Sequence, residues 1–106
     1  MSEDLCEVTI TAPDSEWLAE LAHELIDRNL CASAHVVAPV RSIYRWEGDV
    51  RDTTEARAFL RSRRDQVDDI VHFVTDRHPY EIPNVTAVPI VDGNPRYLDW
   101  VRLATQ

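Results

Sequence analysis

Residues 30–46, LCASAHVVAPVRSIYRW, decide the fold of this chain. The stretch is rich in the β-branched and aromatic residues that are typical of strands: Val36, Val37, Val40, Ile43, Tyr44 and Trp46. Proline cannot donate a hydrogen bond to a sheet, so Pro39 predicts a bulge or an edge position. Gly48-Asp49 predicts a turn, and Thr53–Arg61 resumes a strand-like alternation. Together the two tracts predict a long β-hairpin in the middle of the chain.

The sequence before the hairpin predicts a strand and a helix. Residues 5–12, LCEVTITA, alternate with a period of two, which indicates a strand. Pro13 ends this strand, and Asp14 or Ser15 can cap a helix over Ser15–Arg28. That helix has one apolar stripe, made of Leu18, Leu21, Ala22, Leu25 and Ile26. Asn29 is a suitable left-handed terminator.

The sequence after the hairpin predicts a helix, a strand and a second helix. Arg64–Arg77 has a helical apolar stripe, Val85–Val91 is a short apolar strand, and Asp92-Gly93 turns the chain. Asn94 and Pro95 then start a final helix that includes Tyr97, Leu98, Trp100, Val101 and Leu103. The order βαββαβ plus a terminal helix predicts an α+β, ferredoxin-like sandwich, and 106 residues suit a single domain over 1–106.

The hairpin predicts self-association. Its strands are longer than the first and last strands of the expected sheet, so the overhang would expose aromatic side chains and unpaired backbone edges. Proteins normally cover such edges and patches. Pairing with further copies of this chain is the expected cover.

Composition narrows the class of protein. The net charge is −8, and all eleven basic residues are arginine, so nucleic-acid binding is not expected. The Lys-free, acidic surface fits either adaptation to high salt or a codon-biased genome, and the sequence leaves both open. No apolar run could span a membrane, and Met1–Asp4 is acidic where a signal peptide would be basic, so a cytosolic protein is expected. Cys6 and Cys31 lack a metal-binding spacing and are expected to be buried thiols.

The stretch Arg77–Pro83, RHPYEIP, is the best candidate for a functional loop. Two prolines stiffen it, so it can hold His78, Tyr80 and Glu81 in defined directions. The other histidines are expected to be structural or exposed: His23 and His72 on polar helix faces, and His35 on the long strand. The chain lacks the metal, phosphate-loop and nucleophile patterns that would predict an enzyme. Acylphosphatase shares this fold order, but the turn at Ala12–Ser15 carries an acid where its anion loop would be.

Aromatic residues predict a cleft. If the hairpin overhang meets the RHPYEIP loop of a neighbouring subunit, the walls of the cleft between them would be Tyr44, Trp46, Tyr80 and Trp100. Tyr and Trp are also common anchors of subunit interfaces. The sequence leaves open whether these residues bind a ligand or only hold subunits together.

Five ordered motifs resemble the CutA divalent-cation tolerance proteins over nearly the whole chain. They are TAPD (11–14), IYRWEG (43–48), HPYEIP (78–83), VPI (88–90) and YLDW (97–100). The resemblance implies a cytoplasmic homotrimer of ferredoxin-like subunits, similar in architecture to the PII signalling proteins. It also implies a non-enzymatic role in tolerance of divalent metals, copper above all.

The chain departs from this family at the positions where some members carry cysteines on two strands. Ile10 and Ser33 occupy those positions here, and Cys31 is displaced by two residues. The expected metal ligands are therefore His78, Glu47 and Glu81, with Cys31 as a partial substitute for the thiolates. The alternative is a trimeric small-ligand or assembly module with no specific metal site.

Overall fold

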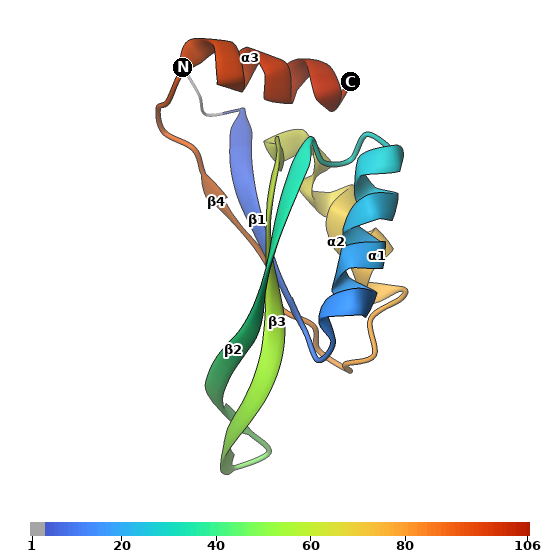
Figure 1. Ribbon diagram of the computed structural model, residues 1–106, viewed down its shortest axis with the longest axis vertical. Helices are drawn as coiled ribbons and strands as arrows, with labels where there is room; N and C mark the ends of the chain where they lie inside the picture. The colour runs from blue at the N-terminus through green and yellow to red at the C-terminus, as the bar shows by residue number, and fades with distance from the viewer. Residues whose placement is uncertain (1–3) are drawn as a thin grey trace.

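Four antiparallel strands form one sheet in the order β2-β3-β1-β4, as Figure 1 shows for the computed structural model. The structure describes residues 4–106, so Met1–Glu3, which bear on the targeting prediction, lie outside it. The elements are β1 (Leu5–Ala12), α1 (Ser15–Asp27), β2 (Ser33–Trp46), β3 (Asp49–Arg63), the short 3₁₀ helix η1 (Arg64–Gln66), α2 (Val67–Thr75), β4 (Val85–Pro89) and α3 (Pro95–Ala104). This order and strand arrangement confirm the predicted ferredoxin-like α+β sandwich.

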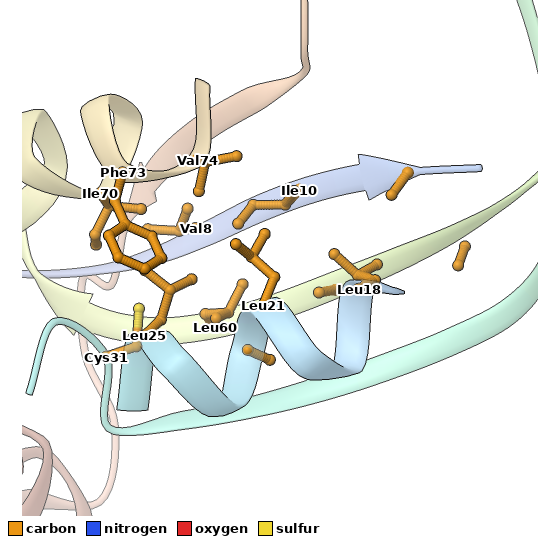
Figure 2. Packing of buried hydrophobic residues seen from close by; sticks show 14 of the residues in the cluster. Val8, Ile10, Leu18, Leu21, Leu25, Cys31, Leu60, Ile70, Phe73 and Val74 are labelled. Carbon is orange, nitrogen blue, oxygen red and sulfur yellow. The ribbon is translucent and has the colours of Figure 1, made fainter. Parts of the chain in front are cut away.

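Helices α1 and α2 cover one face of the sheet and form the main core with it (Figures 1 and 2). Figure 2 shows Leu18, Leu21 and Leu25 of α1 against the strands. The predicted inward face of β1 is confirmed, because all four of its members are buried: Cys6, Val8, Ile10 and Ala12. Burying a leucine fully is worth about 1.5–3 kcal/mol, so this leucine stripe is what holds α1 on the sheet.

Helix α3 lies across one end of the sheet and has its own small core (Figure 1). Leu98 and Val101 of α3 pack with Leu5 and Ala32 in a second buried cluster. The predicted cap is confirmed, since the Asn94 side chain accepts a hydrogen bond from the backbone N–H of Arg96 at 3.1 Å. Leu5 therefore packs against α3, and this end of β1 is buried on both faces of the sheet.

The predicted long hairpin is present and extends well beyond the helices (Figure 1). Strand β2 lies at the edge of the sheet, and its pairing with β3 shifts between Val37 and Val40, which confirms both expectations for Pro39. The turn is one residue earlier than predicted. Glu47 and Gly48 form it with φ of 50° and 82°, and Asp49 already begins β3. Positive φ at both central residues is typical of a type I′ turn, which matches the twist of a hairpin.

Two other predicted boundaries are wrong by a few residues. Residues 64–66 form η1 before α2 begins, because a 3₁₀ turn is a common way to start a helix. Strand β4 ends at Pro89 instead of Val91. The N–H of Ile90 still donates to the Leu5 carbonyl oxygen at 3.1 Å, but β1 begins at Leu5 and has no residue to pair with Val91. Within residues 4–106, no helix is long and apolar enough to cross a bilayer.

Candidate functional site between the hairpin and the 77–83 loop

An open groove lies between the hairpin and the 77–83 loop. Its volume is about 750 Å³, which is within the range of small-molecule sites. It contains three of the four predicted cleft residues, Tyr44, Trp46 and Tyr80, and also Glu81. The remaining lining residues are Thr11, Val40, Arg41, Ser42, Ile43, Arg51, Glu55, Arg57, Pro79, Ile82 and Asn84. The hairpin and the loop of a single chain thus already form a groove.

A hydrogen bond between Tyr80 and Glu55 joins the loop to the hairpin. The Tyr80 hydroxyl donates to Oε2 of Glu55, whose side chain lies on β3 and is only 8% exposed. Burial raises the pKa of Tyr80 well above its usual range, and the hydrogen bond and negative charge of Glu55 raise it further. The phenol therefore stays protonated and keeps donating to the carboxylate.

His78 is buried and fully hydrogen-bonded. Its Nε2 lies 2.7 Å from the carbonyl oxygen of Thr11, and its Nδ1 accepts from the backbone N–H of Tyr80 at 3.0 Å. A neutral imidazole with its proton on Nε2 satisfies both contacts. The ring also contacts Trp17 and Tyr80, with centroids 5.0 Å and 4.8 Å away. The imidazole thus ties the loop to the end of β1.

The four predicted metal ligands lie in four different settings. Glu47 is exposed in the hairpin turn and Glu81 is exposed in the groove, whereas Cys31 is fully buried in the main core. Burial raises the pKa of Cys31 to about 12, which disfavours the thiolate that a metal needs. Among residues 4–106, no group of three or more His, Cys, Asp or Glu side chains is placed to hold a metal ion.

Trp100 lies away from the groove, on α3. Its ring contacts Tyr97 on the same helix, with centroids 5.6 Å apart, and the Tyr97 hydroxyl lies 3.4 Å from Oγ of Ser33. The four predicted cleft residues are therefore divided within one chain, with Tyr44, Trp46 and Tyr80 in the groove and Trp100 beside Tyr97. The reason is that α3 docks at the far end of the sheet from the hairpin turn (Figure 1).

The other three histidines are outside the groove. His23 and His72 are exposed on their helices, as predicted. His35 pairs across the ladder with Phe59 and is also exposed. These three side chains do not contribute to the candidate site.

Sequence reasoning missed Glu55 and Arg57, the two charged residues of β3 that lie closest to the groove's inner wall. Their alternation with Ala56 and Ala58 places them on the face of β3 opposite the helices. The Nε atom of Arg57 is buried and has no hydrogen-bond acceptor within the described chain, and its guanidinium carbon lies 5.1 Å from the centre of the Phe59 ring. The sequence feature that could have identified them is their alternation with apolar residues, which places a Glu and an Arg on the face of the strand that does not contribute to the core.

The chain matches the family described as CutA1 divalent ion tolerance protein over residues 6–104. It is 35% identical over 95 residues to the divalent-cation tolerance protein CutA of Thermus thermophilus, covering 90% of this chain and 92% of that protein. The crystal structure of CutA1 from Oryza sativa is similar, with a TM-score of 0.94, 31% identity, and coverage of 99% and 96% of the two chains.

A third similar protein comes from an archaeon. The structure of the periplasmic divalent cation tolerance protein CutA from Archaeoglobus fulgidus has a TM-score of 0.92 and 27% identity, covering 96% of this chain and 99% of that one. The chain spans about half the length of several curated animal and plant relatives that it matches. The match over residues 6–104, together with the shared fold, shows that this chain belongs to the CutA1 divalent ion tolerance protein family.

Proposed function

We propose that this chain acts in divalent-cation tolerance, with copper as the principal cation, and that it does so without catalysing a reaction. Family membership over residues 6–104 is the observation that carries this proposal. The test is growth of a host that lacks its own member of the family, with and without this chain, at raised copper concentration. Restored growth is expected, and equal growth of both strains would contradict the proposal.

The active form is proposed to be a homotrimer. Three features of the single chain support association: the edge position of β2, the face of the sheet that α1 and α2 leave uncovered, and exposed apolar side chains on the hairpin. Ile43 and Val50 are both 64% exposed there. Such surfaces are normally covered in a stable protein.

The mass in solution tests this association. Light scattering coupled to gel filtration should give three times the chain mass of 12.2 kDa. Ile43→Asp should lower that mass, whereas Glu20→Gln on the exposed face of α1 should leave it unchanged. A wild-type mass equal to one chain would rule out the trimer.

Metal binding is proposed to use Glu81 and Glu47, the two predicted ligands whose carboxylates are exposed. His78 would have to break two hydrogen bonds to ligate a metal, and Cys31 would have to leave the core. Because fewer than three suitable side chains meet within the described part of one chain, a complete site needs groups from adjoining subunits.

Calorimetric titration with Cu²⁺ and Zn²⁺ tests this ligand set. Glu81→Gln and Glu47→Gln should weaken binding, and Glu20→Gln serves as a control of equal charge change. His78→Ala measures the contribution of the imidazole, and equal affinity in this variant and the wild type would remove His78 from the site.

The cytoplasm is the proposed compartment. Both cysteines are free, which fits a reducing environment. One similar structure is that of a periplasmic protein, so cell fractionation is the appropriate measurement. Recovery of the chain with periplasmic or organelle markers would contradict the proposal.

A second candidate function is binding of a small organic ligand, with no specific metal site. The groove carries this candidate, because it combines aromatic walls, a buried carboxylate and an arginine with a buried donor that has no acceptor among the described residues. A ligand screen by calorimetry in metal-free buffer separates the two functions.

A further inference from the structure

We propose that the groove binds a small organic oxyanion, a carboxylate or a phosphate ester, whose charged group contacts Arg57. This inference rests on the second candidate function and names the ligand class and the binding residue. Four observations support it: the unpaired donor of this arginine, its preorganised position, the balance of charge in the groove, and the aromatic wall.

Among the described residues that line the groove, Arg57 has a buried side-chain donor without an acceptor. Arg41, by contrast, is held by Asp52 through two hydrogen bonds of 2.9 Å and 2.7 Å. The Nε atom of Arg57 is buried, and no acceptor for it lies within residues 4–106. Leaving a buried donor unpaired is costly, and a charged donor costs more than a neutral one. An oxyanion in the groove would remove this cost.

Arg57 is held in place before any ligand binds. It lies in the three-stranded part of the sheet, opposite Thr11 of β1 and Val37 of β2. Its guanidinium packs over Phe59, two residues along the same strand. A planar guanidinium fixed in this way can donate two parallel hydrogen bonds to a carboxylate or phosphate.

Neighbouring groups allow an anion at this position. Of the two lining carboxylates, Glu55 already accepts the Tyr80 hydroxyl, and Glu81 is exposed to solvent. Three arginines line the groove against these two glutamates, although the chain carries a net charge of −8. Since Asp52 neutralises Arg41, the remaining arginines balance the two glutamates, and no excess of negative charge repels an anion here.

The rest of the ligand is expected to be flat and apolar. Tyr80 is the aromatic wall for this part of the ligand, because its hydroxyl bonds Glu55, two residues from Arg57. Tyr44 and Trp46 pair with Arg51 and Asp49 and line the groove farther along the hairpin. Aromatic rings of this kind stack on planar groups. Arg51 is too distant to share the same oxyanion, since it lies about 20 Å from Arg57 along β3 at roughly 3.3 Å per residue.

Three probes separate the charged and flat parts of such a ligand. Calorimetry in metal-free buffer would compare phenyl phosphate, inorganic phosphate and phenol. Phenyl phosphate should bind most tightly, inorganic phosphate more weakly, and phenol least. The ¹⁵Nε–¹H signal of Arg57 should shift in an NMR titration with phenyl phosphate. Absence of binding by both phosphates would overturn the proposal.

Variants assign the site to Arg57. Arg57→Met should weaken phenyl phosphate about tenfold or more, as expected for loss of a charge-assisted hydrogen bond. Arg57→Lys keeps the positive charge and is a second variant in case Arg57→Met does not fold. Its affinity for phenyl phosphate should lie between those of Arg57→Met and the wild type. Arg96→Met on α3 changes the net charge equally outside the groove and should bind like the wild type. Equal losses in Arg57→Met and Arg96→Met would contradict the assignment.

Two further outcomes separate this site from its alternatives. If a second copy of the chain fills the groove, Arg57→Met will change the mass of the assembly and not the affinity for phosphate, which would overturn the proposal. If the metal function fails while Arg57-dependent phosphate binding persists, the oxyanion site stands without it.

Discussion

His78 illustrates how a residue chosen for its chemistry can serve the structure. Its ring bonds the Thr11 carbonyl and the Tyr80 amide, and its own backbone N–H donates to the Val74 carbonyl at 2.9 Å. The residue therefore joins the end of α2, the end of β1 and the start of the 77–83 loop. The stiff loop predicted from two prolines is held in place by this side chain together with the hydrogen bond between Tyr80 and Glu55.

Removing the Tyr80 hydroxyl should destabilise the protein. In Tyr80→Phe the carboxylate of Glu55 stays buried but loses its donor, and an unsatisfied buried group costs about 1–3 kcal/mol. Urea unfolding at pH 7 measures this loss. Tyr97→Phe is the control, because the Tyr97 side chain is 39% exposed and should change the free energy of unfolding by less than about 0.5 kcal/mol. Equal effects of both substitutions would be inconsistent with a structural role for the bond.

Alkaline pH should destabilise the protein through Cys31. Its pKa is 9.0 unfolded and about 12 folded, so between these values the unfolded state loses the proton first and is favoured. This contribution to stability is complete below pH 9 and is lost as the pH rises toward 12. The loss should be on the order of 2–3 kcal/mol between pH 8 and pH 11.

The measurement of this effect is simplified because the chain has no lysine to titrate in the same pH range. Cys31→Ala should flatten the fall of unfolding free energy with pH, although Cys6 and Tyr80 have pKa values raised in the same direction and will leave part of it. Parallel pH profiles for the wild type and Cys31→Ala would refute the assignment to Cys31.

At the scale of elements, the hairpin turn is suboptimal. Glu47 adopts φ of 50°, a conformation that asparagine tolerates better than glutamate, and Asn-Gly is the preferred pair for a type I′ turn. Glu47→Asn should raise the free energy of unfolding by about 0.5–1 kcal/mol. Chemical denaturation is the measurement, with Asp49→Asn as the matched control in the adjoining strand. A destabilised Glu47→Asn would mean that the carboxylate has a structural role in the turn.

The elements themselves could be predicted because each carries strong local signals. The Asn94-Pro95 start of α3, the leucine stripe of α1 and the alternation of β1 all correspond to the structure. Boundaries at η1 and Pro89 differ because they depend on hydrogen bonds between segments, which periodicity does not encode.

The candidate site was only partly predictable. Tyr44, Trp46, Tyr80 and Glu81 were found from residue type and loop stiffness, and they do line one groove. Glu55 and Arg57 were missed because their role depends on which loop covers the polar face of β3. Trp100 was grouped with them because the sequence does not show at which end of the sheet α3 docks.

At the scale of the whole molecule, net charge should make stability depend on salt. A net charge of −8 opposes the compact state by self-repulsion, and salt reduces the Debye length from about 30 Å at 0.01 M to about 3 Å at 1 M. Exposed ion pairs such as Arg41–Asp52 weaken in salt, but they contribute only about 0–1 kcal/mol each. The free energy of unfolding should therefore rise with NaCl concentration.

Urea unfolding across that salt range decides between the two origins of the acidic surface. A marked rise favours adaptation to high salt. A flat or falling profile would contradict such adaptation and leave codon bias as the explanation of the Lys-free composition.

Beyond the end of β1, the hairpin continues as a two-stranded ribbon. The last rung with three strands joins Thr11, Arg57 and Val37, β1 ends with Ala12 opposite Ala56, and beyond that point β3 pairs with β2 alone. A two-stranded ribbon twists more readily than a wider sheet. The hairpin thus leaves the wider sheet beside the hydrogen bond between Tyr80 and Glu55. The groove is lined by both the hairpin and the 77–83 loop, so a molecule bound in it would contact the two parts that this hydrogen bond joins.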